Sequence, residues 1–257
     1  MRRWRLGSIA RGFGRAIVYV LATVLATVGI AIVVLETGWA KNRIRELIVR
    51  QANEYLTATL EIGRLEGSIF RGLQLGDIRL SRNNQPIITI EQVSLSYSLR
   101  ELWQNGTVIR RIRLVRPSFA IAKEADGRWN IGALVKREAR QEKVTGPGRP
   151  IQILSIEIAD GRIVLGNPLE FGAAHVPTDF ESLNASFAFE YRPVHWTLTF
   201  ANASWIGRAP DLTMSKLSGV LGNGPFGWRF DRFAVQTPRS AFTLTGDIER
   251  DVDPTRL

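Results

Sequence analysis

The hydrophobic pattern of the chain has two parts, a long apolar run near the start and many short alternating runs after it. Residues 16–35 form an unbroken stretch of 20 residues without a charge. A helix rises about 1.5 Å per residue, so this stretch would span roughly 30 Å, the thickness of the hydrocarbon core of a bilayer. The run therefore predicts a transmembrane helix.

Arginines precede this run, and no acidic residue lies among them. Basic residues favour the cytoplasmic side, so residues 1–15 are predicted to be a cytoplasmic tail, with everything after residue 36 across the membrane. A cleavable signal peptide is the main alternative, but its apolar region is usually about 7–15 residues long and ends at a small-residue site that is not evident here. We therefore expect an uncleaved single-pass anchor. The residues that set its topology are Arg2, Arg3, Arg5, Arg11 and Arg15.

Residues 36–59 show a helical pattern after the anchor. Apolar residues such as Ile44, Leu47, Ile48 and Tyr55 recur at spacings of three and four, and charged residues lie mostly on other faces. The pattern predicts an amphipathic helix. It would either cover the start of a sheet domain or lie on the membrane surface.

From residue 60 onward the period changes to two, which indicates strands. Val93, Leu95, Tyr97 and Leu99 alternate with serines, and similar runs recur towards the end of the chain. We expect a first β segment at 60–135, a linker at 136–150, which is charged and then rich in Gly and Pro, and a second, open-ended β segment at 151–257. The apolar face of such a sheet must pair with another sheet, close on itself, or curl around something apolar.

Several local signals refine this prediction. Asn105-Gly106 and Asp160-Gly161 favour tight hairpins, and the glycines and prolines of 207–228 favour loops with short strand pieces. Ile88 and Ile90 fall on the opposite parity to the Val93–Leu99 run. A bulge or break is therefore expected near Gln92.

Composition and charge narrow the possible functions. The chain has 257 residues, no cysteine and two histidines, which excludes thiol-ligated metal sites and disulfides and offers little for a histidine metal site. The net charge is +10, but residues 1–58 carry a surplus of six, which weakens the case for nucleic-acid binding. His175 and His195 are twenty residues apart and form no catalytic motif. We expect no enzyme activity, no cofactor and no nucleic-acid partner.

Three stretches carry a resemblance to a known family. LEIGRLEGSIFRGLQLGDIRLS (60–81), SFAIAKEADGRWNIGAL (118–134) and IEIADGRIVL (156–165) resemble the AsmA-like superfamily and, within it, the TamB family of translocation-and-assembly-module components. The arrangement of basic start, single anchor, short helix and strands is also similar. Residues 166–257 add only compatibility with a β-rich fold.

The resemblance implies a location and a function. It implies a protein anchored in the inner membrane of a diderm bacterium, with its N-terminus cytoplasmic and its bulk periplasmic. It implies a mainly β fold with one N-terminal transmembrane helix, in which short strands and hairpins form a curled, antiparallel-rich groove. The implied role is outer-membrane biogenesis, by shielding phospholipid acyl chains or by assisting outer-membrane protein assembly and secretion. An outer-membrane barrel of the TamA type would be a partner through a C-terminal region, which we expect to be missing because this chain is shorter than its relatives.

An alternating strand suits such a groove because one face supplies an apolar wall while the other remains hydrated. The same alternation is typical of an ordinary protein core, so a membrane-anchored β-sandwich with a closed core is the alternative interpretation. The candidates for the groove face are Leu95, Tyr97, Leu99, Ile112, Leu114, Ile156, Ile158, Phe187, Phe189, Trp196, Leu198 and Phe200.

Overall fold

The computed structural model describes most of the chain after residue 36. The described residues are 37–68, 70, 72–98, 107–124, 127–134, 136, 150–171 and 174–249. The predicted anchor at 16–35 and its five flanking arginines lie outside this part of the chain, as do Asn105-Gly106 and nearly all of the predicted linker. Among the described residues, no helix has both the length and the apolar character needed to cross a bilayer.

Helix α2 (Gly38–Tyr55) lies within the range predicted for an amphipathic helix. Thr37 precedes it and acts as its N-cap, because its Oγ1 accepts a hydrogen bond of 3.3 Å from the backbone nitrogen of Ala40. At the other end the backbone nitrogen of Lys136 donates to the carbonyl of Tyr55 at 2.9 Å. The last turn of the helix is thereby joined to a segment far along the chain.

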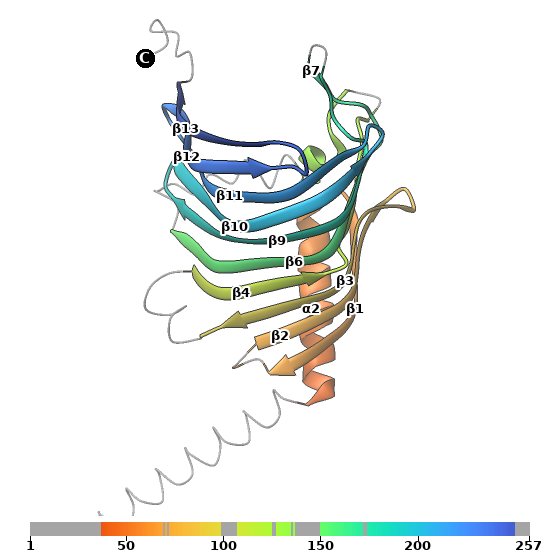
Figure 1. Cartoon of the computed structure of the whole chain (residues 1–257). Coiled ribbons are helices and arrows are strands. Elements are labelled where there is room, and N and C mark those ends of the chain that lie inside the picture. Colours follow the sequence, from red (N-terminus) through yellow and green to blue (C-terminus); the bar gives the residue numbers. More distant parts are fainter. Residues whose placement is uncertain are drawn as a thin grey trace, which may run out of the picture. The chain divides into compact units, whose positions relative to one another are not determined.

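The rest of the described chain is mainly β (Figure 1). One eleven-stranded sheet has the order β1-β2-β3-β4-β6-β9-β10-β11-β12-β13, and β5 pairs with both β3 and β6. The short strands β7 and β8 form a separate pair. The strands are β1 (Thr59–Ser68), β2 (Gly72–Arg82), β3 (Gln85–Tyr97), β4 (Thr107–Val115), β5 (Ser118–Ile121), β6 (Ile151–Leu165), β7 (Glu170–Phe171), β8 (Ala174–His175), β9 (Asp179–Arg192), β10 (His195–Arg208), β11 (Leu212–Gly224), β12 (Gly227–Gln236) and β13 (Ala241–Glu249).

The two predicted β segments belong to one sheet. Strands β4 and β5 both pair with β6 in parallel, whereas the other described pairings are antiparallel. A parallel pair needs a long crossover connection, and here it includes the short 3-10 helix η1 (Asn130–Ala133). The sheet is antiparallel-rich, as predicted, with one parallel seam in its interior.

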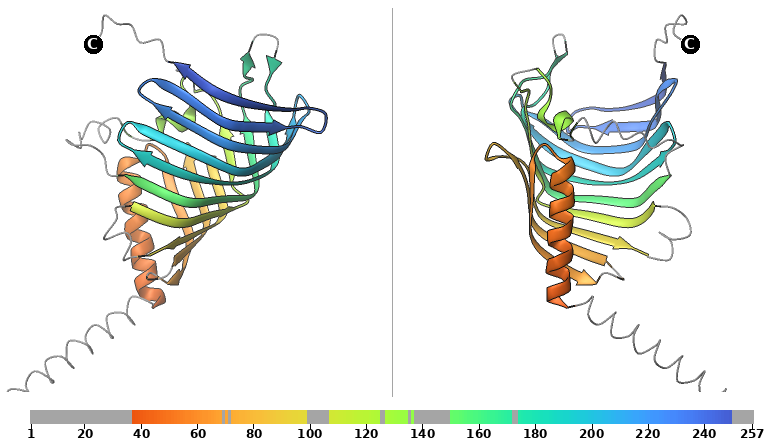
Figure 2. Two further views of the ribbon diagram at one scale, coloured as in Figure 1. Left: turned by 60° about the vertical axis from the view of Figure 1, so that its left-hand side comes forward. Right: turned by 180° about the vertical axis from the view of Figure 1, so that it is seen from behind.

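A line of bulges crosses the sheet from β6 to β12, where the pairings of these strands shift register. Non-glycine residues adopt positive φ at successive positions along it, and Gly219 in β11 has a φ of 122°. Bulges bend a strand and increase its twist, so a line of them bends the whole sheet. Figures 1 and 2 show that strands β9–β11 bend sharply towards one end of each strand. The other members of this line, which we call the bulge line, are Asp160, Ser182 and Arg232. Asp77 and Arg116 also have positive φ, but Asp77 lies in a stretch of constant register and Arg116 lies between β4 and β5.

The bulge line also explains why the apolar parity changes along the strands that it crosses. In β3 the change falls where the partner strand switches from β4, paired at Gln92, to β5, paired at Ile88 and Thr89. An inserted residue shifts the alternation by one, so both arms of a bent strand can present apolar side chains to the same face. The pairing of β3 with β2 continues from Ser96 to Ile88 without a register shift, so β3 itself carries no inserted residue near Gln92, and its ladder with β4 ends there instead.

Two local predictions are wrong. Asp160-Gly161 makes no hairpin, because strand β6 continues through both residues without reversing. Asp160 has a positive φ of 54° and lies in a bulge. A Cβ on Gly161 would lie 3.0 Å from Ile158 and 3.2 Å from Pro117, so this glycine allows close packing. The region 207–228 consists mainly of strands β11 and the ends of β10 and β12 rather than loops. Its glycines serve bulges and close approaches within the sheet.

The core of this sheet is small. Most of its buried apolar side chains lie near its N-terminal end, including Ile62, Leu65, Leu80 and Ile87 at 6–8% exposure. The fully buried large side chains are Pro117 and Pro177. Most other apolar residues of the strands are half-buried, so the described part of the chain does not seal its apolar face beneath a second sheet.

Candidate functional site

The strand register places the predicted groove residues on a common face. Leu95 lies opposite Ile112, Ile112 opposite Ile156, Ile156 opposite Phe187, and Phe187 opposite Phe200. Residues directly opposite each other on neighbouring strands project from the same side of a sheet. These five side chains therefore form one row across β3, β4, β6, β9 and β10.

The remaining candidates extend this row on both sides. Leu114 lies opposite Ile158, and Phe189 lies opposite Leu198. Tyr97 is two residues from Leu95, and Trp196 is two residues from Leu198, so each shares its neighbour's face. Leu99 lies outside the described residues. All eleven described candidates thus share one surface, which we call the apolar face; whether it binds lipid stays a prediction.

The structure adds residues that the sequence analysis missed. Leu221 lies opposite Leu198, Phe230 opposite Leu221, and Trp228 opposite Asn223. Leu221 and Trp228 were missed because 207–228 was interpreted as loops on account of its glycines, and Phe230 directly follows that region. The alternation of Trp228 and Phe230 with Arg229 and Asp231 is a signal that could have identified strand β12.

The opposite face of the same strands is polar. Ser94 lies opposite Arg113, Arg113 opposite Glu157, and Glu157 opposite Ser186. Arg113 is exposed, whereas Leu114 beside it is half-buried. One face of the sheet is thus hydrated while the other presents hydrocarbon and aromatic rings.

The character of the apolar face changes along the sheet. Strands β2 to β6 contribute mostly leucine and isoleucine, and strands β9 to β12 contribute mostly aromatic rings. The rings of Phe187 and Phe200 are 5.3 Å apart, those of Phe200 and Phe233 are 6.1 Å apart, and those of Phe230 and Phe233 are 5.8 Å apart. These edge and tilted contacts stabilise the arrangement of the rings without covering the face.

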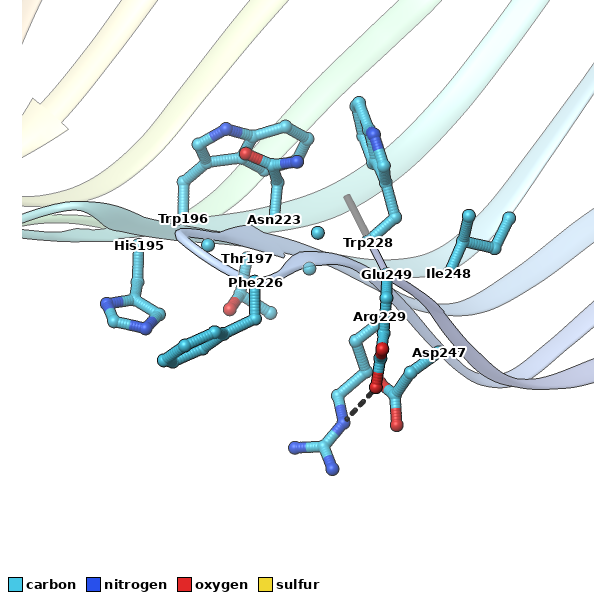
Figure 3. A pocket seen from close by; sticks show the side chains of 13 residues that line it. His195, Trp196, Thr197, Asn223, Phe226, Trp228, Arg229, Asp247, Ile248 and Glu249 are labelled. Atoms are coloured by element: carbon cyan, nitrogen blue, oxygen red, sulfur yellow. Dashed lines mark ion pairs between the residues drawn. The ribbon is translucent and has the colours of Figure 1, made fainter. Parts of the chain in front are cut away.

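A pocket of about 430 Å³ lies where β10 to β13 meet the rim of the sheet (Figure 3). Trp196 and Trp228 stand on one side of the ribbon with Asn223 between them, and their rings are 5.5 Å apart at 85°. His195, Phe226 and Arg229 point to the other side. The Nδ2 of Asn223 is buried without a hydrogen-bond partner among the described residues. This end of the apolar face therefore carries one polar group among aromatic rings.

Ion pairs link neighbouring strands across the sheet. Arg64 contacts Asp77 at 3.1 Å, Arg111 contacts Glu157 at 3.1 Å, and Arg162 Nε donates to Asp179 at 3.0 Å. The hydrogen bond from Arg162 lowers the pKa of Asp179 below its usual value. Most of these groups are well exposed, so each pair contributes little to stability and the set mainly keeps this side hydrated.

The described residues contain no group of three or more His, Asp or Glu side chains positioned to hold a metal ion. His175 lies in β8 and His195 begins β10, and both side chains are exposed. What the described chemistry offers is an extended apolar surface suited to binding.

Comparison with known proteins identifies a family. The model of the AsmA family matches residues 13–189. The matched range contains α2, strands β1 to β8 and most of β9, and it is more than half of the chain. No curated protein matches the chain.

Proposed function

Because this chain belongs to the AsmA family, we propose that its apolar face shields the acyl chains of phospholipids between the two membranes of a diderm bacterial envelope. The observation that carries this proposal is the continuity of the face. The rows through Ile156 and Phe187 and through Phe189 and Leu198 run from strand to strand without a charged side chain at the paired positions.

The energetics support a lipid as the occupant. Each methylene removed from water contributes about 0.8 kcal/mol, so an acyl chain laid along several rows of such side chains would be well stabilised. The side chains in these rows are half-buried, which leaves them able to contact a guest. A wall of leucine, isoleucine and aromatic rings needs no catalytic group for this role.

The setting follows from the same proposal. Residues 16–35 would anchor the protein in the inner membrane, with residues 1–15 cytoplasmic and the sheet periplasmic. The role would be in outer-membrane biogenesis, through phospholipid transport and, in a TamB-like function, through assembly of outer-membrane proteins with a TamA-type barrel. We expect no nucleic-acid partner for a periplasmic protein of this kind, and we propose no enzymatic step.

The closed β-sandwich alternative expects two large sheets packed face to face. The described residues instead form one eleven-stranded sheet and one minor pair. That arrangement favours an open face over a sealed core.

Site-specific photocrosslinking in cells tests the proposal. Leu198 and Thr199 are adjacent residues of β10, so their side chains project from opposite faces of the sheet. Thr199 is exposed on the polar face. We expect a benzophenone amino acid at position 198 of the full chain to form adducts with phosphorus-labelled phospholipid. The same residue at position 199 is the matched control and should form few or none.

Two outcomes would contradict the proposal. One is the absence of a lipid adduct at position 198 in protein that has the circular dichroism and protease resistance of the unmodified chain. The other is equal labelling at both positions, because that would indicate general proximity to a membrane. A Leu198→Glu variant should lose co-purifying phospholipid, whereas Thr199→Glu should retain it.

A further inference from the structure

Helix α2 contacts the sheet through one of its sides. Asn53 donates to the carbonyl of Leu60 at 3.2 Å and accepts from its backbone nitrogen at 2.7 Å. Arg45 donates to the carbonyls of Ile62 and Gly63 at 3.2 and 2.6 Å. Arg45 and Asn53 are eight residues apart, so they project about 80° apart around the helix axis. This side of α2 therefore faces β1 and is held there by hydrogen bonds.

A different side of α2 exposes apolar side chains. Leu47 is 55% exposed, Ile48 37% and Tyr55 49%. Their spacings of seven and eight residues place them along one side of the helix, with Gln51 between them. Leu47 is two residues after Arg45, which turns the helix by about 200°, so it projects away from β1. We call Leu47, Ile48, Gln51 and Tyr55 the helix stripe.

The exposed surface beside the helix stripe is charged. Glu46, Arg50 and Glu54 recur every four residues and are exposed, so they form a charged strip along α2. The helix as a whole carries four basic and two acidic residues, and Trp39 in its first turn is 66% exposed. Apolar and charged strips side by side, with an excess of basic residues, are typical of helices that lie in a membrane surface. Tryptophan also favours the membrane–water interface.

The place of α2 in the chain favours a bilayer as the occupant of the stripe. The predicted membrane run ends at residue 35, and α2 begins at Gly38. Three residues span at most about 11 Å, so an anchored chain would start α2 close to the hydrocarbon of the bilayer. At the other end, the segment after Lys136 has five charged residues among 137–143. Such a segment suits water better than it suits an apolar stripe.

We propose that the helix stripe lies in the periplasmic surface of the inner membrane, an inference that rests on the anchor and the location proposed above. The apolar side chains would enter the boundary between headgroups and acyl chains, and the charged strip would remain among the headgroups. The side that carries Arg45 and Asn53 would keep its hydrogen bonds to β1. Helix α2 would thereby hold the start of the sheet, where the apolar face is rich in leucine and isoleucine, beside the bilayer.

Fluorescent probes on the helix test this inference. The chain has no cysteine, so one introduced cysteine can carry an NBD label at a chosen position. Positions 48 and 50 are two residues apart and project about 200° apart, which makes them a matched pair. In the full chain reconstituted into vesicles of phosphatidylethanolamine and phosphatidylglycerol, lipid-borne nitroxides should quench the probe at 48 at least about twofold more than the probe at 50. Aqueous iodide should show the reverse order.

A pair of variants locates the contact to the stripe. Leu47→Gln places an amide on the stripe and should lower the quenching of a probe at position 51 by lipid-borne nitroxides. Glu54→Gln introduces the same side chain on the charged strip and should leave that quenching unchanged. Both positions are exposed, so both variants should keep the circular dichroism of the unmodified chain.

The outcomes separate this inference from the function proposed above. Equal quenching at 48 and 50, in a chain that resists carbonate extraction from the vesicles, would overturn the inference and leave the anchor in place. Release by carbonate together with an unquenched probe at 48 would contradict both. Energy transfer between probes at 48 on separate copies, persisting in detergent, would identify a second copy as the occupant. Lipid adducts at position 198 test the apolar face independently of all these results.

Discussion

The N-terminal and C-terminal ends of the sheet are built from the same alternating pattern but have different surroundings. Around β1 to β3, Ile62, Leu65 and Leu80 are buried, and α2 closes the outer edge. Around β12 and β13, Trp228 is 40% exposed, and every residue of the last strand is exposed. Alternation therefore specifies a strand with one apolar face, and the neighbouring elements decide whether that face is buried.

This difference separates structural from binding roles. Apolar residues at the N-terminal end contribute mainly to stability, because burying them removes their surface from water in the folded protein itself. Those at the C-terminal end remain accessible, and large exposed apolar patches usually mark interaction surfaces. Substitutions should therefore affect stability at one end and binding at the other.

The largest effect is expected from a charge at the buried end. Leu80→Asp would bury an unpaired carboxylate at a site that is 7% exposed and should lower the unfolding free energy by about 3–5 kcal/mol. Phe242→Asp introduces the same side chain at an exposed site and should cost less than about 1 kcal/mol. Urea unfolding followed by circular dichroism measures both, and equal losses would remove the distinction between the two ends.

The second-largest loss of stability is expected from a substitution at a glycine of the bulge line in β11. Gly219 has a φ of 122°, and a Cβ there would lie 2.4 Å from the carbonyl oxygen of Arg232. Gly219→Ala should therefore cost about 1–3 kcal/mol. At Gly222 the nearest atom would lie at 3.8 Å, so Gly222→Ala is the matched control and should be nearly neutral. Similar stabilities of the two variants in thermal unfolding would count against the bulge line.

A smaller effect is expected when the closed edge loses its cover. Asn53→Ala removes two hydrogen bonds to the backbone of Leu60 and should cost about 1–2 kcal/mol. Hydrogen exchange at the Leu60 amide should accelerate, while exchange in β13 remains unchanged. Gln51→Ala, on the exposed side of the helix, serves as the control. Unchanged protection of Leu60 would show that α2 does not close this edge.

The smallest effect concerns the polar side that both ends share. Because the pKa of Asp179 is lowered in the folded protein, its contribution to stability is present above its unfolded pKa of about 3.9. That contribution is lost as the pH falls through the lower folded value. Asp179→Asn should therefore lose stability slightly at neutral pH and show a shallower decline below about pH 4. Parallel acid-unfolding curves for the variant and the unmodified chain would contradict this linkage.

Much of the fold was predictable from local pattern. Alternation such as that at Val93, Leu95 and Tyr97 identified the strands, and the cross-strand register places the described groove candidates on one face. The hairpin at Asp160-Gly161 was predicted wrongly because a positive φ serves a bulge as well as a turn. The parallel seam was not predicted, because it depends on a crossover between distant segments.

That seam has a consequence for how the chain folds. Most strand pairings here join neighbours along the sequence, and such local contacts form quickly. The pairing of β4 with β6 brings together Val115 and Ala159, so it must close a long loop before it gains any contacts. We therefore expect the meanders on either side of the seam to form first. Their docking along β4 and β6 would then be the slow step that commits the chain to one continuous sheet.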